Sequence, residues 1–240
     1  MDVPCTAVVP SAPHSHTVVF LPGRGDNVSN FLTALARSRD SHSRTLADAL
    51  PSFRWVFPQA PTRVCASNPP NAWSQWFDVY DTRDFALREE LQAEGLRESV
   101  PAIRRILASE AALLGGRWDR VVLMGISMGG ATSVHTLFNL EVPVENGRQL
   151  GAFIGFSCRC PFAGRTLAQM RQVLGLANDN SNNSSEPVQS RVLSNTPILL
   201  EHCVDDPVVP VESGRGLRDT LQGFGAPGPL ERVSQRRPLV

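Results

Sequence analysis

The sequence Arg120-Val121-Val122-Leu123-Met124-Gly125-Ile126-Ser127-Met128-Gly129-Gly130 decides the fold that we expect of this chain. Its first half is an apolar run that predicts a buried strand, and residues 131–140 predict a helix. A strand, a G-x-S-x-G pattern and a helix in this order form a nucleophile elbow, which holds the Ser127 hydroxyl above the sheet edge. Side chains at positions 125 and 129 would collide with the neighbouring strand and helix, so both are glycines. A Gly-rich turn without catalytic function is the alternative, and the flanking elements favour the elbow.

Strand-like and helical segments alternate along the rest of the chain. We expect strands at 17–21, 53–58, 151–157 and 197–202, and helices at 31–50, from near Ser99 to Gly115, and at 217–225. Pro101 fits a helix only within the first turn, which is why we begin the second helix near Ser99. Residues 71–81 are irregular and aromatic, and residues 178–190 have too few apolar side chains to be more than a loop. The alternation predicts an α/β protein with a mainly parallel sheet and helices on both faces, in a single domain over 1–240.

Composition and charge exclude several classes of function. The chain has 240 residues, of which 42% are hydrophobic, with 23 basic and 23 acidic side chains. This balance argues against nucleic acid as a partner. There is no apolar stretch long enough for a transmembrane segment and no signal peptide, so the five cysteines are expected to be free thiols in a cytoplasmic protein. Cys158-Arg159-Cys160 has the wrong spacing for zinc, and we expect neither a metal nor an organic cofactor.

Partners for Ser127 can be proposed from the same pattern. A serine nucleophile needs an imidazole base that is itself oriented by a carboxylate, and in α/β-hydrolases the acid follows a later strand. Asp205 and Asp206 come directly after the strand that ends at His202, and one of them is expected to be only a solvated turn residue. The backbone N–H groups of Met128 and Arg24 are the expected oxyanion donors, because Arg24 lies in a Gly-rich turn after the first strand.

Four blocks together resemble the phospholipase/carboxylesterase family of α/β-hydrolases, which includes the acyl-protein thioesterases, and fungal members most of all. The blocks are residues 20–27 (FLPGRGDN), 76–78 (WFD), 125–130 (GISMGG) and 202–210 (HCVDDPVVP), within residues 17 to about 224. The resemblance implies that Asp206, before the proline, is the acid. It also implies hydrolysis of carboxylic esters and long-chain thioesters through an acyl-enzyme on Ser127, with an acylated protein, a small ester or a lysophospholipid as substrate. Trp76 and Phe77, with Met128, are expected to contact the acyl chain, or else to be plain core.

Two positions depart from the family pattern. Pro22 stands where the family usually has a histidine, although the N–H of Arg24 remains. More important, the family places its catalytic histidine on a loop after a final strand, and no histidine follows Asp206 in this chain. The five histidines present are at positions 14, 16, 42, 135 and 202, and we expect none of them to be the base. His135, for example, lies about 12 Å along the elbow helix from Ser127.

The tail over residues 226–240 (APGPLERVSQRRPLV) differs from the rest of the chain. It has three prolines and no alternating apolar pattern, so we expect the family's last strand, histidine loop and closing helix to be missing. The preceding strand would then be an exposed edge. We expect this tail to result from a frameshift, an altered splice or a gene-model error, with functional redesign as the alternative. A catalytically impaired, acyl-binding protein is therefore the alternative function.

Overall fold

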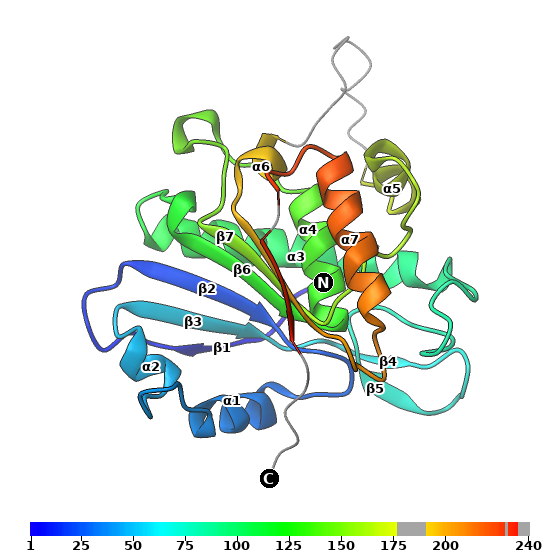
Figure 1. Cartoon of the computed structure of the whole chain (residues 1–240), viewed down its shortest axis with the longest axis horizontal. Coiled ribbons are helices and arrows are strands. Elements are labelled where there is room, and N and C mark those ends of the chain that lie inside the picture. Colours follow the sequence, from blue (N-terminus) through cyan, green and yellow to red (C-terminus); the bar gives the residue numbers. More distant parts are fainter. Residues whose placement is uncertain (177–190, 229, 235–240) are drawn as a thin grey trace.

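The computed structural model describes residues 1–176, 191–228 and 230–234 (Figure 1). Short 3-10 turns lie at Trp118–Arg120 and Val144–Asn146. In chain order the strands and α-helices are β1 (Cys5–Val8), β2 (His16–Leu21), α1 (Val28–Arg37), α2 (Leu46–Ala49), β3 (Phe53–Pro58), β4 (Thr62–Val64), β5 (Ala72–Ser74), α3 (Leu91–Leu113), β6 (Val121–Ile126), α4 (Met128–Phe138), β7 (Ala152–Phe156), α5 (Leu167–Val173), α6 (Arg191–Asn195), β8 (Ile198–Cys203), α7 (Val211–Gly223) and β9 (Leu230–Ser234). Within the described residues, no helix is both long and apolar enough to cross a membrane.

Seven strands form one sheet in the order β1-β3-β2-β6-β7-β8-β9. All neighbouring pairs are parallel except β1 with β3, which is antiparallel. Strands β4 and β5 form a separate antiparallel pair. The predicted α/β architecture with a parallel-dominated sheet is confirmed. Because parallel strands place their carboxyl ends at one edge, the residues after β2, β6, β7 and β8 meet there.

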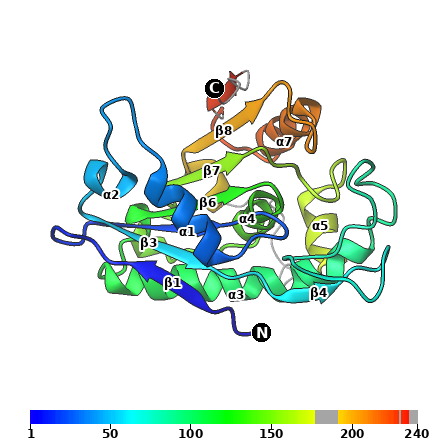
Figure 2. The ribbon, with the colours of Figure 1, turned by 90° about the horizontal axis from the view of Figure 1, so that it is seen from below.

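Helices cover both faces of the sheet, and each face has its own apolar core. Along β2, Val19 and Leu21 contribute to the core beneath α3, α4 and α7, whereas Val18 and Phe20 contribute to the core beneath α1 and α2. This division follows from the period of two along a strand, which sends successive side chains to opposite faces. Figure 1 shows α1 and α2 apart from the group formed by α3, α4 and α7, and in Figure 2 α2 and α7 lie on opposite sides of the sheet.

The start of α3 differs from our expectation. The helix begins at Leu91 rather than near Ser99, so Pro101 lies in its interior. Pro101 has no N–H to donate to the carbonyl of Arg97, a defect that costs about 3 kcal/mol in an isolated helix. The buried face of α3 continues on both sides of Pro101, from Leu96 to Leu107, and its packing against the sheet and α4 offsets the lost hydrogen bond.

The expectation that the last strand is missing was wrong. Residues 230–234 form β9, which pairs in parallel with β8 over Leu199–Cys203. The strand β8 is therefore not the exposed edge that the tail composition predicted. The five residues LERVS have little periodicity of their own, and the backbone hydrogen bonds of β8 supply the order. The expected absence of a closing helix falls on residues 235–240, outside the described residues.

Smaller differences concern the first half of the chain. The expected helix over 31–50 is divided into α1 and α2 by the polar segment 38–45, and Asn27 and Thr45 cap the two helices. Strand β1 was not predicted, and the irregular 71–81 segment contains β5. The expected loop at 178–190 lies outside the described residues.

Candidate active site

Ser127 lies between the end of β6 and the start of α4, in a strained backbone conformation with φ 53° and ψ −121°. The turn is tight enough to require glycines on both sides. A Cβ at Gly125 would lie 2.7 Å from the backbone of Gly129, and a Cβ at Gly129 would lie 2.3 Å from the carbonyl oxygen of Leu21. Both distances are shorter than real Cβ contacts, so the G-x-S-x-G pattern is required by packing at this turn.

The loop after β2 packs directly against this turn. A Cβ at Gly23 would lie 3.5 Å from the Ser127 Cβ and 4.0 Å from its Oγ. The Trp76 indole N–H donates to the Pro22 carbonyl oxygen at 3.0 Å, and this hydrogen bond fixes the loop after β2. Among the hydrogen bonds of the described residues, none uses the backbone N–H of Arg24 or of Met128. Met128 is the first residue of α4, where the helix dipole favours negative charge.

Asp206 accepts hydrogen bonds from the loop that follows β8. The backbone N–H groups of Val208 and Val209 donate to its Oδ1 at 2.9 and 3.0 Å. Partial burial alone would raise the pKa of Asp206, but these hydrogen bonds and one from the Ser157 side chain outweigh it and lower the pKa below its ordinary value. Asp206 is therefore an ionised, fixed carboxylate at neutral pH.

Ser157 joins Asp206 to the elbow, and the sequence analysis did not find it. It follows β7 and has a φ of 42°, an unusual value for a residue other than glycine. Its N–H donates to the carbonyl oxygen of Glu201 in β8 at 2.8 Å, while the N–H of Ser127 donates to that of Phe156 at 2.9 Å. These bonds bring the ends of β6, β7 and β8 together. A polar residue at the end of a predicted strand was the only signal in the sequence.

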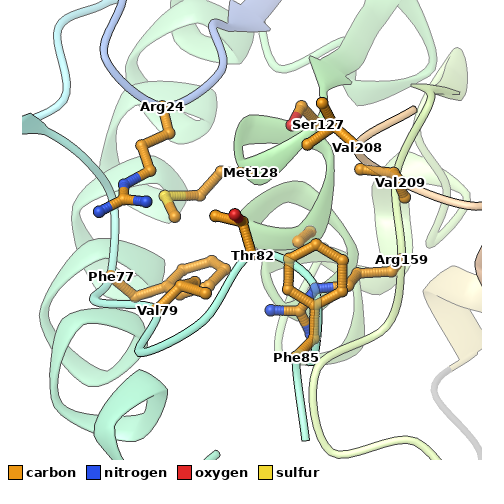
Figure 3. A pocket seen from close by; sticks show the side chains of 11 residues that line it. Arg24, Phe77, Val79, Thr82, Phe85, Ser127, Met128, Arg159, Val208 and Val209 are labelled. Atoms are coloured by element: carbon orange, nitrogen blue, oxygen red, sulfur yellow. The ribbon is translucent and has the colours of Figure 1, made fainter. Parts of the chain in front are cut away.

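A cavity lies beside Ser127 (Figure 3). Its lining residues come from the loop after β2, from the segment that precedes α3, from the start of α4, and from the loops after β7 and β8. They are Arg24, Phe77, Val79, Thr82, Phe85, Ser127, Met128, Ala131, Arg159, Val208 and Val209. Phe77 is thus at the cavity, as is Met128. Trp76 is not among the lining residues, because its ring is fully buried and supports the loop at Pro22.

None of the five histidines, all of which lie within the described residues, lines this cavity. His14 and His16 lie at the amino end of β2, on the opposite edge of the sheet, and His42 is exposed between α1 and α2. His202 is buried, and its Nε2 donates to the carbonyl oxygen of Val209 at 2.7 Å, which fixes the loop that carries Asp206. We place the ring proton of His202 on Nε2, because the Val209 carbonyl oxygen can only accept a hydrogen bond.

His135 is a fully buried residue of α4, and its Nε2 donates to the carbonyl oxygen of Pro161 at 3.0 Å. Burial lowers the pKa of His135 to about 4, and the hydrogen bond to Pro161 opposes that shift only in part. The ring is neutral at physiological pH and supports the loop after β7. Its contacts are with Phe138 and Phe162 rather than with the cavity.

Within the described parts of the chain, no group of three His, Cys, Asp or Glu residues could hold a metal ion. Cys158 and Cys160 are buried thiols, and burial raises the pKa of each to about 12. A thiol with so high a pKa is a poor metal ligand and a poor nucleophile. Ser127 is therefore the nucleophile candidate at the cavity.

Several known proteins are similar to this chain over most of its length. Acyl-protein thioesterase 1 of Cryptococcus neoformans is 24% identical over 214 residues, 89% of this chain and 76% of the relative. A rice protein, Oryza sativa subsp. japonica, is 28% identical over 218 residues, with 89% of this chain and 74% of the relative covered, and is named a probable inactive carboxylesterase. The crystal structure of Zea mays acyl-protein thioesterase 2 superimposes with a TM-score of 0.71 at 25% identity, covering 98% of this chain and 90% of the other.

The α/β-hydrolase fold is thereby confirmed. Residues 4–235 match the phospholipase/carboxylesterase family, so the similarity extends past residue 224, where we expected it to end, and includes β9. This match spans nearly the whole chain and contains the elbow, the loop after β2 and the loop of Asp206. The chain belongs to the phospholipase/carboxylesterase family.

Proposed function

We propose that this protein is a serine hydrolase of carboxylic esters and thioesters that forms an acyl-enzyme on Ser127. The observation that carries the proposal is the position of Ser127, on a strained turn at the start of α4 and at the wall of a cavity. The names of the relatives support an acylated protein or a small ester as substrate.

The reaction divides into two steps around this serine. The Ser127 Oγ attacks the acyl carbon, and the N–H groups of Met128 and Arg24 stabilise the negative charge on the carbonyl oxygen. The alcohol or thiol leaves with a proton, and water then attacks the acyl-enzyme and releases the acid. Each step needs a base to take a proton and return it. Asp206 can orient such a base and stabilise its positive charge, but it cannot replace it.

A fluorophosphonate probe tests the nucleophile. We expect the probe to label the wild-type protein slowly and the Ser127→Ala variant not at all. The Ser133→Ala variant is the matched control, because Ser133 is buried in the same helix and does not line the cavity. Equal labelling of the wild type and Ser127→Ala would rule out Ser127.

A second candidate function is an acyl-binding protein that retains the cavity without turnover. It is favoured by the absence of a histidine at the cavity, and the rice relative named a probable inactive carboxylesterase supports it. Binding of an uncleavable acyl amide without ester hydrolysis would support this candidate. Hydrolysis that is lost in His202→Ala would instead indicate an unusual triad.

A further inference from the structure

The cavity beside Ser127 contains a buried cation that the proposed reaction does not use. Arg159 follows β7, and only 8% of the residue is exposed. Its guanidinium carbon lies 4.2 Å from the centre of the Phe85 ring, and one of its N–H groups donates to Gln92 Oε1 at 2.6 Å. Figure 3 shows Arg159 beside Phe85, below Ser127. A full positive charge is therefore part of the wall that an acyl group would contact.

This charge is not neutralised by an ion pair. The ion pairs of the described residues do not include Arg159. Burial lowers the pKa of Arg159 to about 10, opposed by the nearby Glu89, so the guanidinium remains charged at neutral pH. The Glu89 carboxylate itself accepts a hydrogen bond from the N–H of Phe162 at 2.7 Å. The bond to Gln92 uses one of the five guanidinium donors.

The rest of the wall adds positive charge and no negative charge. Arg24 also lines the cavity, and its guanidinium donates to two neutral groups, Gln75 Oε1 at 2.8 Å and Cys65 Sγ at 3.1 Å. None of the 11 lining residues is acidic. The cavity volume of about 60 Å³ is far below that of a usual ligand pocket.

These features disfavour a long alkyl chain in the cavity. The end of such a chain would displace water from the Arg159 guanidinium without offering it an acceptor, which is costly for a buried charge. A carboxylate would instead accept the remaining N–H groups in a bidentate pair, the arrangement for which guanidinium geometry is suited. The apolar side chains of Phe77, Val79 and Val208 would contact the few methylene groups between the two carboxyl carbons.

We propose that Arg159 determines the acyl specificity of this site, which favours esters and thioesters of short dicarboxylic acids, bound with the free carboxylate on Arg159. The proposal rests on the proposed function, because it places the ester carbonyl at Ser127. Arg159 is a substrate-binding residue here and takes no part in proton transfer.

Hydrolysis of two matched esters tests the specificity. One is the p-nitrophenyl monoester of glutaric acid, and the other carries an isopropyl group in place of the free carboxylate, with the same shape and no charge. The uncatalysed rate of each ester is subtracted, because the free carboxylate of the glutarate ester also attacks its own ester carbonyl. We then expect the wild-type kcat/KM to favour the charged ester by about 10- to 100-fold. Arg159→Leu should remove this preference, and Arg159→Lys should retain part of it.

Arg165→Leu is the control, because Arg165 is exposed over the Phe162 ring and does not line the cavity. It removes the same charge and should leave the preference unchanged. If Arg159 only stabilised the loop through Gln92 and Phe85, Arg159→Leu would lower hydrolysis of both esters alike, and the proposal would be wrong.

Binding to the Ser127→Ala variant separates this proposal from the proposed function. Calorimetry measures the binding of the anilides of the same two acids to this variant, which lacks the nucleophile and does not turn them over. Tighter binding of the charged anilide that is lost in Ser127→Ala/Arg159→Leu supports the specificity even if the wild type hydrolyses nothing, in which case only the proposed function fails. Equal binding of the two anilides to Ser127→Ala would overturn the specificity, whatever the hydrolysis results.

Discussion

Ser127 has a backbone conformation that glycine adopts readily and other residues rarely do. Strain of this kind costs on the order of 1–3 kcal/mol and is maintained by the surrounding structure, here the packing of β6, α4 and the loop after β2. In the proposed reaction this strained conformation matters because it directs the Ser127 hydroxyl toward the cavity.

We expect Ser127→Gly to be more stable than both the wild type and Ser127→Ala. Glycine relieves the strain, and the larger entropy of the unfolded glycine chain cancels about 0.5–1 kcal/mol of the gain. The free energy of unfolding in urea should rise by about 1 kcal/mol. Ser133→Gly makes the same chemical change at an ordinary helical position of α4 and should be destabilising. A Ser127→Gly variant less stable than Ser127→Ala would contradict the strain.

His135 should make stability depend on pH. Its pKa is lowered to about 4 in the folded protein, from 6.5, so the unfolded chain binds more protons between these values. The free energy of unfolding therefore falls as the pH decreases through this window, by about 2 kcal/mol between pH 7 and pH 5. His135→Gln retains a donor for the Pro161 carbonyl and cannot ionise. In urea unfolding, its free energy of unfolding should therefore fall by about 2 kcal/mol less than that of the wild type between pH 7 and pH 5.

The matched control for this prediction is His42→Gln. His42 is exposed, so its replacement should leave the pH dependence as in the wild type. Identical curves for His135→Gln and the wild type between pH 7 and pH 5 would show that His135 does not carry this effect.

At the scale of elements, the approach of α3 to the segment before it sets the position of Phe77 at the cavity. A Cβ at Gly95 would lie 2.4 Å from the Phe77 Cα and 2.7 Å from the Trp76 carbonyl oxygen. That same carbonyl accepts a hydrogen bond from the Ser99 hydroxyl at 2.9 Å. Backbone meets backbone here, so no side chain can move aside to make room.

We expect Gly95→Ala to destabilise the protein by about 1–3 kcal/mol, because α3 must move away from Trp76 and Phe77. Helix propensity alone predicts the opposite, a gain of up to about 1 kcal/mol. Gly216→Ala is the control within α7, where an added Cβ meets no heavy atom within 4 Å, and it should be stabilising by about 0.5–1 kcal/mol. Thermal unfolding shows whether Gly95→Ala lowers stability and Gly216→Ala raises it. A stabilised Gly95→Ala would contradict the close approach of α3 to Trp76 and Phe77.

At the scale of the whole molecule, the decisive feature is that none of the five histidines, all within the described residues, lines the cavity beside Ser127. The loss of one triad member costs on the order of 10⁶ in kcat, and roughly 10³-fold over water remains from the oxyanion hole and binding. We expect hydrolysis of p-nitrophenyl esters close to background. Added imidazole should raise the rate in the wild type and not in Ser127→Ala, because the free base can replace the missing side chain. Rates typical of the family without imidazole would contradict the impairment.

The transcript across the codons from Gly225 onward tests the origin of the missing base. The pairing of β9 with β8 shows that residues 230–234 still complete the sheet, so we expect any departure from the family to follow Ser234. A reading frame that continues there into a Gly-His loop and a helix would restore a base. A transcript that confirms residues 235–240, together with fast hydrolysis, would show that the chain is active as it stands.

Much of the site could be predicted because it is local in sequence. Ser127, Met128 and their glycines lie within a few residues, and a strand, a turn and a helix in succession leave little choice of geometry. The residues by themselves left Asp205 and Asp206 both open, and only the resemblance to the family implied Asp206, whose carboxylate accepts hydrogen bonds from Val208 and Val209 of its own loop. Ser157 and Arg159 were missed as site residues, because neither has a motif and each acquires its role from partners far along the chain, such as Asp206 for Ser157 and Gln92 for Arg159.

By itself, the sequence determined the α/β class, the positions of the main strands along the chain and the position of the elbow, since these follow from hydrophobic period and turn chemistry. Only the tertiary structure decided that α3 continues through Pro101, that LERVS forms β9 and that a charged guanidinium lies at the cavity. In each case the local preference is weak or unfavourable, and contacts with distant segments outweigh it: the packing of α3, the hydrogen bonds of β8, and the bond and ring that Gln92 and Phe85 provide for Arg159.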